Sequence, residues 1–363
     1  DLIRVNGRAA LEMHRYSSDR TYTRFDGRTA REYLDSLNFP PAARRMLFDV
    51  FSHSFFNPEE KMSAADLLMM FHYYFLANEE GLVFDVLDDT FERSLLTPLR
   101  DYLEARGVNF ELGRRVTALS PAARSIEGSV PGGAQRDGWR VSHQATDGMG
   151  SSREQDADLV VLGLNVSAVR ALVEASPAAG DPPWRSRVDS LSETSPFAVW
   201  RMWLDRPTAE GRAAFVGTAG FPLLDNISLY HLFEAESREW AARTGGSVIE
   251  LHAYGMPEHS TEAEIRTAML AGLHELIPES RDAGLVHEEF FIERDCPAFP
   301  PGGHARRPGV ETPEPGLALA GDFVRMDFPT ALMESATASG FLAACVLVRP
   351  HGVSPEPLQS VAL

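Results

Sequence analysis

The sequence predicts an α/β fold combined with a separate α+β domain, and three features indicate this. The first is a buried strand at residues 158–163 that leads directly into a helical segment, Val166–Ala175. The second is a series of alternating, strand-like segments between residues 184 and 295, with one long amphipathic helix before the last of them. The third is a short apolar strand, Leu317–Ala320, followed by a helix that runs to Val348. A strand that feeds a helix is typical of a parallel sheet, whereas strands in series are typical of an antiparallel sheet.

Length, charge and cysteine content exclude several classes of protein. The 363 residues are enough for about two domains of ordinary size with a sizeable core. The net charge of −18 excludes broad nucleic-acid binding, which needs a basic surface, and it disfavours an anionic membrane surface. Two cysteines are too few for a disulfide framework or a four-thiolate zinc site. We find no run of about 18 apolar residues that would predict a transmembrane helix.

The first hundred residues are predicted to be mostly helical. Amphipathic periodicity indicates four helical segments: Arg28–Leu37, Pro41–Phe51, Ala65–Leu76 and Pro98–Arg106. Gly107 directly follows the last of them and suits its C-terminal cap. Ser63 followed by Asp66 resembles a capping box at the start of the third helix. That helix is apolar on nearly every face, so we expect it to be buried or to line an apolar cavity.

From residue 108 onward the hydrophobic period changes to two, which indicates strands. In the first group the expected strands are Val108–Leu112, Val116–Leu119, Trp139–His143 and Asp158–Gly163, with a loop over 120–137. In the second group they are Pro196–Asp205, Ala213–Gly217, Asn226–Leu232, Ser247–Tyr254 and Val286–Arg294, with the helix Thr261–Ile277 before the last. The segment Pro297–Pro315 is rich in Pro, Gly and Arg and is expected to connect the second group to the C-terminal strand.

The C-terminal strand, turn and helix form the most informative pattern. Gly321-Asp322 ends the strand, and Phe328-Pro329 precedes the helix. The helix is expected to present small residues on one stripe: Ala336, Ser339, Gly340, Ala343 and Ala344. Small residues allow close approach, and the free N–H groups of a helix N-terminus favour a negative group. A tightly packed strand–turn–helix without a ligand is the alternative, but the complete pattern favours a cofactor site.

This pattern resembles the C-terminal flavin motif of the FAD-dependent amine oxidase and carotenoid desaturase superfamily. The motif is carried by Leu317, Leu319, Ala320, Gly321, Asp322, Pro329, Met333, Glu334, Ala336, Ser339, Gly340, Ala343 and Ala344. Ser335 stands where the family usually has Gly. Gly107-Val108 with Val116, and the strand at 158–162, also follow the family's order. Within the superfamily, four segments look most like the bacterial β-carotene desaturase/methyltransferases, the isorenieratene synthases: Phe51–Pro58, Phe71–Phe75, Phe197–Arg201 and Trp203–Pro207.

The resemblance implies an incomplete FAD-binding Rossmann-like domain of the amine oxidase or phytoene desaturase type, with a substrate domain of mixed or antiparallel sheet and helices. Residues 1–100 would be the helical part of the substrate-binding region, and 184–295 the substrate domain. Residues 101–175 and 300–349 would belong to the FAD-binding domain, and 350–363 would be a tail. The implied FAD contacts are Val116, through its backbone to adenine, and Gly321, Asp322, Pro329, Met333 and Ala336.

One departure from the family pattern is serious. The family begins with a strand and G-x-G-x-x-G that opens a helix, where the FAD pyrophosphate binds. No such motif occurs in residues 1–363. We therefore expect the chain to be a fragment that begins after this segment and that binds FAD weakly or not at all by itself.

The resemblance also implies the chemistry: a flavin accepts hydride, a carotenoid end ring loses hydrogens, and a methyl group shifts through cationic intermediates. Aromatic faces stabilise cations, so the candidate substrate-lining residues are Phe55, Phe71, Tyr74, Trp200 and Trp203. For any single one, a plain core role is the simpler interpretation, as it is for His53 and His72. Arg201 is expected to bind a carboxylate, and Glu234 and Glu236 to lie on a solvated face. No residue is singled out as a catalytic acid or base, and no histidine spacing predicts a metal.

Three functional hypotheses are compatible with the sequence. The leading one is an FAD-dependent oxidoreductase that desaturates a carotenoid β-ionone ring toward an aromatic end group. The second is a carotene isomerase or another isoprenoid desaturase on the same scaffold. The third is a cofactor-free fragment that binds a polyene without chemistry. The expected partner is an apolar carotenoid rather than nucleic acid, and the expected location is cytoplasmic, with peripheral contact at a membrane as an alternative. The sequence indicates no oligomeric state.

Overall fold

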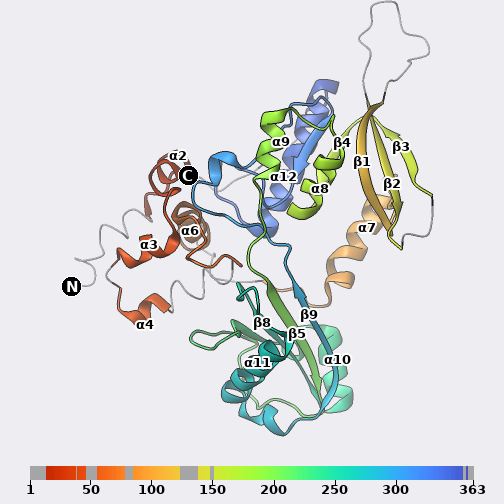
Figure 1. The fold of residues 1–363 in the computed structure, drawn as a ribbon. Coiled ribbons are helices and arrows are strands. Elements are labelled where there is room, and N and C mark those ends of the chain that lie inside the picture. Colours follow the sequence, from red (N-terminus) through yellow and green to blue (C-terminus); the bar gives the residue numbers. More distant parts are fainter. Residues whose placement is uncertain are drawn as a thin grey trace, which may run out of the picture.

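The computed structural model describes residues 14–37, 39–45, 55–77, 85–122, 138–147, 151–354 and 357–358. Figure 1 shows four regions: helices near the N-terminus, a helix-flanked pair of parallel strands, a three-stranded meander, and a five-stranded sheet with two helices. His53 and the rest of Phe51–Ser54, part of a segment that carries the family resemblance, lie outside the described residues.

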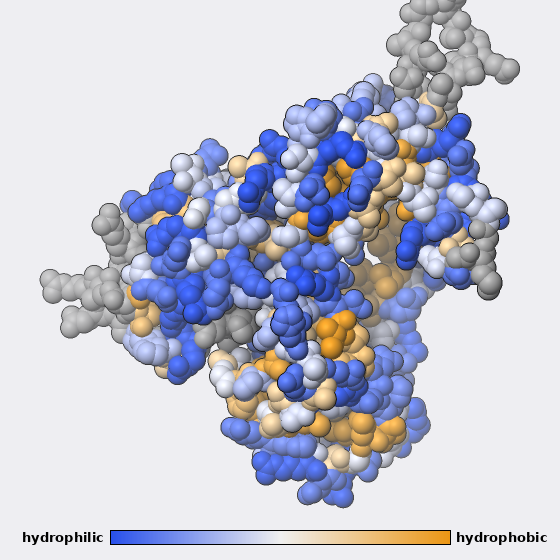
Figure 2. All heavy atoms as spheres, viewed as in Figure 1, coloured by the Kyte–Doolittle hydropathy of each residue, from blue (hydrophilic) through white to orange (hydrophobic). Residues whose placement is uncertain are grey.

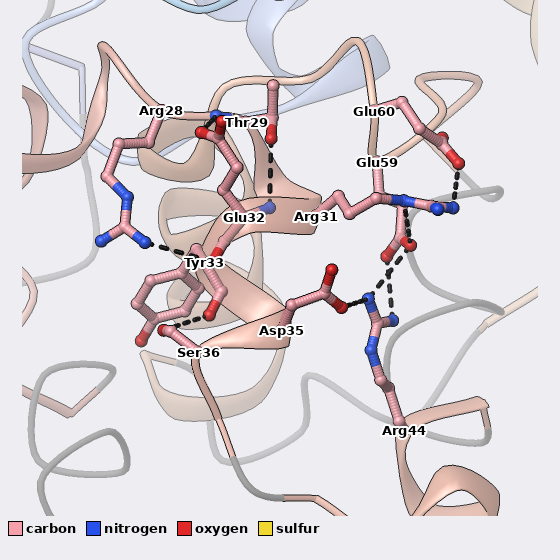
Figure 3. A network of polar contacts seen from close by, with 10 residues as sticks. All are labelled: Arg28, Thr29, Arg31, Glu32, Tyr33, Asp35, Ser36, Arg44, Glu59 and Glu60. Atoms are coloured by element: carbon pink, nitrogen blue, oxygen red, sulfur yellow. Dashed lines mark hydrogen bonds and ion pairs between the residues drawn. The ribbon is translucent and has the colours of Figure 1, made fainter.

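The N-terminal helical region contains α2 (Ser18–Phe25), α3 (Ala30–Asp35), α4 (Pro41–Arg44) and α6 (Ala64–Phe71), which continues as the π-helix η2 (His72–Leu76). Figure 3 shows how its outer part is held: Arg44 donates to Glu59 at 2.9 and 3.1 Å and to Asp35 at 2.9 Å. Thr29 and Glu32 form a reciprocal capping box at the start of α3. These polar contacts fix α3 and α4 over the segment that enters α6.

Helix α6 is buried, as expected for a helix that is apolar on nearly every face, whereas η2 contains no buried residue. The expected capping box at its start is only half present. Ser63 accepts a hydrogen bond from the backbone N–H of Ala65, but Asp66 points inward, where its side chain is 1% exposed. This carboxylate pairs with a buried cation, Arg307, instead of capping the helix.

Two parallel strands form the centre of the molecule. β4 (Val160–Gly163) pairs with β10 (Leu317–Ala320), with Leu317 opposite Val160, so the pairing expected between these distant segments is confirmed. Helices α8 (Val166–Ala175), α9 (Pro182–Asp189) and α12 (Leu332–Val348) lie around them (Figure 1). Helix α9 was not expected from the sequence. One apolar cluster joins these strands and helices.

The meander consists of β1 (Arg114–Ala122), β2 (Gly138–Ala145) and β3 (Arg153–Ala157), all antiparallel. The strand expected at Val108–Leu112 is absent; that segment is irregular and exposed. It follows η3 (Glu92–Leu96) and α7 (Thr97–Glu104), neither of which has a buried residue. Gly107 adopts the left-handed conformation (φ 87°) expected of a C-terminal cap.

The remaining sheet is antiparallel, with the strand order β6-β7-β8-β5-β9. Its strands are β5 (Phe197–Leu204), β6 (Phe215–Gly217), β7 (Asn226–Leu229), β8 (Ser247–Ala253) and β9 (Leu285–Glu293), with α10 (Ala235–Thr244) and α11 (Glu262–Leu276). Short 3₁₀ turns are η4 (Tyr230–Leu232), η5 (Pro278–Asp282), η6 (His304–Arg306) and η7 (Arg349–His351). One face of the sheet packs on α11 in an apolar cluster that includes Trp200, Met202 and Leu251. Because side chains alternate along a strand, Arg201 and Trp203 belong to the other face.

Apolar side chains are also exposed. Figure 2 shows apolar surface on the region that contains the five-stranded sheet. There Val286 is 58% and Phe291 is 45% exposed. On α7 and α12, Leu99 is 49% and Phe341 is 62% exposed.

The packing of α12 corrects two expectations. Of the predicted small-residue stripe, Ser339 and Ala343 are buried, but Ala336 and Ala344 are exposed and a Cβ on Gly340 would meet nothing within 4 Å. In addition, Leu332–His351 spans 20 residues with a mean hydropathy of 1.3, which is long and apolar enough to cross a membrane by length and composition alone. A core helix passes the same test, and the inner face of α12 packs on β10.

The first prediction concerns two glycines of the C-terminal motif. Gly321 has φ 154°, and an added Cβ would lie 2.5 Å from the ring of Phe323. We expect Gly321→Ala to lower the free energy of unfolding by about 1–3 kcal/mol through overpacking. Gly340→Ala is the matched control, because it adds a methyl to open space inside a helix and is expected to stabilise by about 0.5–1 kcal/mol. Urea unfolding measures both; equal effects of the two changes would contradict the packing described.

Candidate functional site

The end of β10 is held by hydrogen bonds from α12. The Ser339 hydroxyl accepts from the backbone N–H of Gly321 at 2.9 Å and donates to the carbonyl of the same residue at 3.1 Å. Ser335 donates more weakly to the carbonyl of Asp322 at 3.4 Å. The serine that replaces the family's usual glycine is therefore buried and bonded to the turn. These contacts fix the turn from strand to helix at the position where the motif predicts a cofactor.

Asp322 is the charged group of this turn, and it is partly buried. Burial, aided by the nearby charge of Asp295, raises its pKa from 3.8 to about 6, although backbone N–H groups of the turn oppose this. A carboxyl group at this position can accept a hydrogen bond from a hydroxyl group. A carboxylate surrounded by bulk water would not show this shift.

The N-terminus of α12 is strained and partly open. Ala331 is its N-cap, and Leu332 has φ 53°, which is rare for a residue with a side chain. The Thr330 hydroxyl is buried and has no hydrogen-bond partner among the described residues. Pro329 is buried, whereas Met333 and Ala336 are exposed. The predicted contacts Gly321, Asp322, Pro329, Met333 and Ala336 therefore lie on one turn and one helix end.

A small cavity lies between this turn and the helical region, and a buried ion pair forms its wall. Its free volume of about 20 Å³ is room for roughly one water molecule. Arg307 donates to Asp66 at 2.8 Å, and the Tyr22 hydroxyl donates to the same oxygen at 2.9 Å. The second oxygen of Asp66 and the Nε of Arg307 have no partner among the described residues. The cavity lining includes Tyr16, Tyr22, Phe299, Arg307, Asp322, Thr330 and Ser335.

His304 stacks on Tyr22 with 3.5 Å between ring centroids. Burial and the charges of Arg307 and Arg325 lower the pKa of His304 to about 3, so the ring is neutral at physiological pH. Its Nδ1 therefore accepts the hydrogen bond from Arg307 at 3.0 Å. Sequence reasoning missed Tyr22, Asp66 and Arg307; the one available signal was an acidic residue inside an apolar helix.

Three of the predicted substrate-lining residues come together and two do not. Phe55 is buried in the cluster of the helical region, and Phe71 and Tyr74 pack against that cluster. Ala331 and Leu332 of α12 are part of the same cluster, so these aromatic rings border the motif. His72 stacks on Tyr16 at 4.9 Å between centroids.

Trp200 and Trp203 lie elsewhere. Trp200 is in the core between the sheet and α11, and its indole N–H donates to Glu288 at 2.7 Å. Trp203 is on the other face and contacts His287, with 5.0 Å between ring centroids. Val116 is on β1, 40% exposed, next to a break in the strand register. The structure thus brings Val116 into an accessible position without joining it to the α12 end.

The five-stranded sheet contains a second cluster of polar side chains, apart from the one around Asp66 and Arg307. Arg201 binds a carboxylate, as expected: its Nε donates to Glu250 at 2.6 Å. Glu234 was expected on a solvated face, but it is 6% exposed and accepts a hydrogen bond from Ser237 at 2.6 Å. Glu236 is exposed. A bonded charge pair thus lies on the sheet face opposite α11.

Comparisons with known proteins agree with the motif. Residues 3–348 match the model of a protein family described as flavin containing amine oxidoreductase. A carotenoid phi-ring synthase of Streptomyces griseus is 41% identical over 99% of this chain, which spans 66% of that relative's length. A carotenoid phi-ring synthase of Chlorobaculum tepidum is 28% identical over 97% of this chain and 70% of its own. A probable zeta-carotene desaturase of Synechococcus elongatus is 24% identical over 81% of this chain and 61% of its own.

Solved structures show the same fold. A putrescine oxidase matches with a TM-score of 0.67 and 13% identity, over 96% of this chain and 76% of its own. Cyclohexylamine oxidase from Brevibacterium oxydans matches with a TM-score of 0.64 and 13% identity, over 95% and 74%. At these identities the likeness concerns the fold alone.

The second prediction follows from the raised pKa of Asp322. The buried group favours its neutral form, so the stability it contributes is fully present below about pH 4 and is lost as the pH rises through about 6. We expect Asp322→Asn to match the wild type near pH 4 and to exceed it by up to about 3 kcal/mol at pH 8. Urea unfolding across this pH range tests the prediction, and a difference that stays constant with pH would refute it.

The third prediction concerns the Asp66–Arg307 pair. Removing one partner leaves a buried charge, so Arg307→Met is expected to cost about 3–5 kcal/mol of unfolding free energy. The double variant Asp66→Leu with Arg307→Met removes both charges and should recover most of this loss. Thermal and urea unfolding of the single and double variants measure the coupling. Additive losses would mean that the two side chains act independently.

Proposed function

Because the chain belongs to the family of flavin-containing amine oxidoreductases, we propose that it is an FAD-dependent oxidoreductase that desaturates a carotenoid β-ionone ring and shifts a methyl group to form an aromatic end group. The observation that carries this proposal is the turn from β10 to α12, with the partly buried Asp322 and the strained helix start at Leu332. The similarity to two carotenoid phi-ring synthases supports the choice of ring desaturation.

The residues at the turn fit a flavin. The Asp322 carboxyl group suits a hydroxyl of the ribityl chain, and the unpartnered Thr330 hydroxyl suits a polar edge of the ring system. The exposed side of α12 at Met333 and Ala336 leaves room for a planar group outside the small cavity. Free N–H groups at the helix start favour partial negative charge there. When bound, the flavin supplies the hydride acceptor.

The chain's own residues would bind and orient the polyene. Phe71 and Tyr74 are partly buried against the cluster that contains Phe55 and Ala331, and they offer aromatic surface near the start of α12. Such a surface excludes water, and aromatic faces attract a cation that develops on the ring. The Asp66–Arg307 pair is buried behind this surface, where it holds the helical region against the connection that leads to β10.

Two alternatives each have one observation in their favour. Similarity to a probable zeta-carotene desaturase favours desaturation of a different carotenoid. The lack of G-x-G-x-x-G in residues 1–363 favours a polyene-binding role without chemistry. Product analysis separates the first alternative from our proposal, and the flavin content of the purified protein separates the second.

The fourth prediction tests the proposed function. The protein is expressed from its complete gene in bacterial cells that accumulate β-carotene, and the pigments are separated and identified by mass spectrometry. We expect carotenoids with aromatic end rings. Asp322→Ala should lower both the flavin retained on purification and the aromatic product by about tenfold or more, because it removes a hydrogen bond of about 1.5–3 kcal/mol.

Asp327→Ala is the matched control, since this aspartate is exposed in the same segment. It should leave flavin content and product unchanged. Unchanged flavin content in Asp322→Ala would refute the role of Asp322. Flavin-loaded protein that gives only acyclic desaturation products, or none, would refute ring desaturation.

A further inference from the structure

A line of hydrogen bonds crosses the face of the five-stranded sheet that α11 does not cover. Arg201 on β5 donates to Glu250 on the neighbouring strand β8 at 2.6 Å. The other carboxylate oxygen of Glu250 lies 2.7 Å from Nε2 of His252, and Nδ1 of His252 lies 2.6 Å from the hydroxyl of Tyr254. Asn226 on β7 donates to the same hydroxyl at 2.8 Å. Five side chains from three neighbouring strands and their ends thus form one continuous line.

The charges at one end fix where each hydrogen lies. Burial by itself disfavours the charged form of Glu250, but the hydrogen bond from His252 and the charge of Arg201 together hold its pKa below the ordinary value. An ionised Glu250 accepts only, so Nε2 of His252 carries the hydrogen and Nδ1 is free to accept. The Tyr254 hydroxyl therefore donates to Nδ1, and its oxygen keeps one lone pair beside the bond from Asn226.

The groups around this line are accounted for. Tyr230 lies under the Arg201 guanidinium at 3.9 Å and also bonds Glu250. Glu234 faces Arg201 at 3.8 Å, and Asp225 accepts from the backbone N–H of Tyr254 at 2.6 Å. Among the described residues, none of these contacts takes the second lone pair of the Tyr254 oxygen.

One end of the line is left incomplete. The Oδ1 of Asn226 is buried and has no partner among the described residues, and Asn226 itself is 5% exposed. A buried, unfilled acceptor costs free energy, so its retention beside Tyr254 needs an explanation. A ligand group at this point would supply one.

The line ends against aromatic rings that lead to the start of α12. The ring of Phe56 lies 4.6 Å from that of Tyr254 and 5.0 Å from that of Phe197. Phe56 has φ 59°, a strained conformation for a residue with a side chain, and its neighbour Phe55 is in the cluster that contains Ala331. Phe56 therefore links Tyr254, through its neighbour Phe55, to the cluster that meets the start of α12.

We propose that Tyr254, His252 and Glu250 form a proton relay that receives the proton lost when the carotenoid ring is desaturated. The inference rests on the proposed function. In each desaturation one C–H bond gives up hydride to oxidised flavin, which is reduced by two electrons. The resulting cation loses a proton from an adjacent carbon to the Tyr254 oxygen, and the electron pair of that C–H bond becomes the new C=C bond. The Tyr254 proton passes to Nδ1 of His252.

The order of hydroxyl, imidazole and carboxylate suits this task. Glu250 would stabilise the imidazolium that forms, as a carboxylate does for histidine in hydrolytic triads. Burial raises the pKa of Tyr254 well above its ordinary value, so the phenol enters the step neutral and passes its proton on. A proton lost from a carbocation is acidic enough for such an acceptor. Tyr254 would be the catalytic residue, and Glu250 and Arg201 would be positioning residues.

The fifth prediction separates proton loss from hydride transfer. Flavin-loaded protein expressed from the complete gene is mixed with β-carotene in vesicles without oxygen, and flavin bleaching and product are followed in one turnover. In Tyr254→Phe we expect bleaching within about threefold of wild type, and the product of the first desaturation, which has lost two hydrogens, lowered by roughly 100-fold, the usual scale of general acid–base catalysis. Tyr102→Phe is the matched control, because it removes the hydroxyl of an exposed tyrosine on α7 that is not part of the line, and it should leave both rates within about threefold.

His252→Ala tests the relay in a second way. It should lower product formation similarly, and added imidazole should restore at least part of it, which a purely structural role would not allow. Product formation in Tyr254→Phe within about threefold of wild type would overturn the relay, and so would an equal loss of bleaching and product in protein that is folded. If the wild type shows no bleaching with β-carotene, the proposed function fails, and the relay for ring desaturation falls with it.

Discussion

The buried pair of Asp66 and Arg307 is the contact on which the rest of the arrangement depends. The two residues are 241 positions apart, and they join the start of α6 to the connection that leads into β10. In a low-dielectric interior neither charge is tolerated alone, so the pair must form whenever both segments are in place. Tyr22 on α2 bonds the same carboxylate. One ion pair therefore fixes two helices of the N-terminal region against the C-terminal motif.

This constraint explains why the cluster around Phe55 meets the start of α12. Asn57 supports the same junction, since its buried side chain bonds the carbonyl of Pro297 and the N–H of Phe299. The chain between residues 55 and 66 is thus tied twice to residues 297–307. Strained backbone is found at Phe56, within the first of these segments, and at Leu332, which packs against the cluster that contains Phe55. Strained residues persist where the surroundings over-determine them, which is common at binding sites.

The hydrophobic period of individual segments predicted helices and strands. It could not predict the contacts that form between residues far apart in the sequence. Hydrophobic period identified α8, α11, β8 and β9 to within two residues, and the motif located the turn at Gly321-Asp322. Val108–Leu112 has the hydrophobic period of a strand but no partner strand among the described residues. The strand predicted there from the period alone is therefore wrong. Asp66 looked like a helix cap because its buried partner lies far away in sequence. His252 and Tyr254 form a line with Glu250 only because β8 pairs with β5 and β7, a register that no single segment reveals.

In the proposed reaction, the hydride and the proton of the carotenoid ring go to different acceptors, the flavin and Tyr254. Phe55 belongs to the cluster that meets the start of α12, and its neighbour Phe56 contacts Tyr254 at the end of the hydrogen-bond line. A carbocation between two acceptors partitions according to which is nearer and better aligned. Separate acceptors let the cation persist long enough for a methyl group to shift before the proton is lost. An acceptor for the proton on the flavin side would quench the cation at once and give plain desaturation. In the proposed reaction, a proton acceptor that is separate from the hydride acceptor is therefore the feature that would distinguish ring aromatisation from plain desaturation.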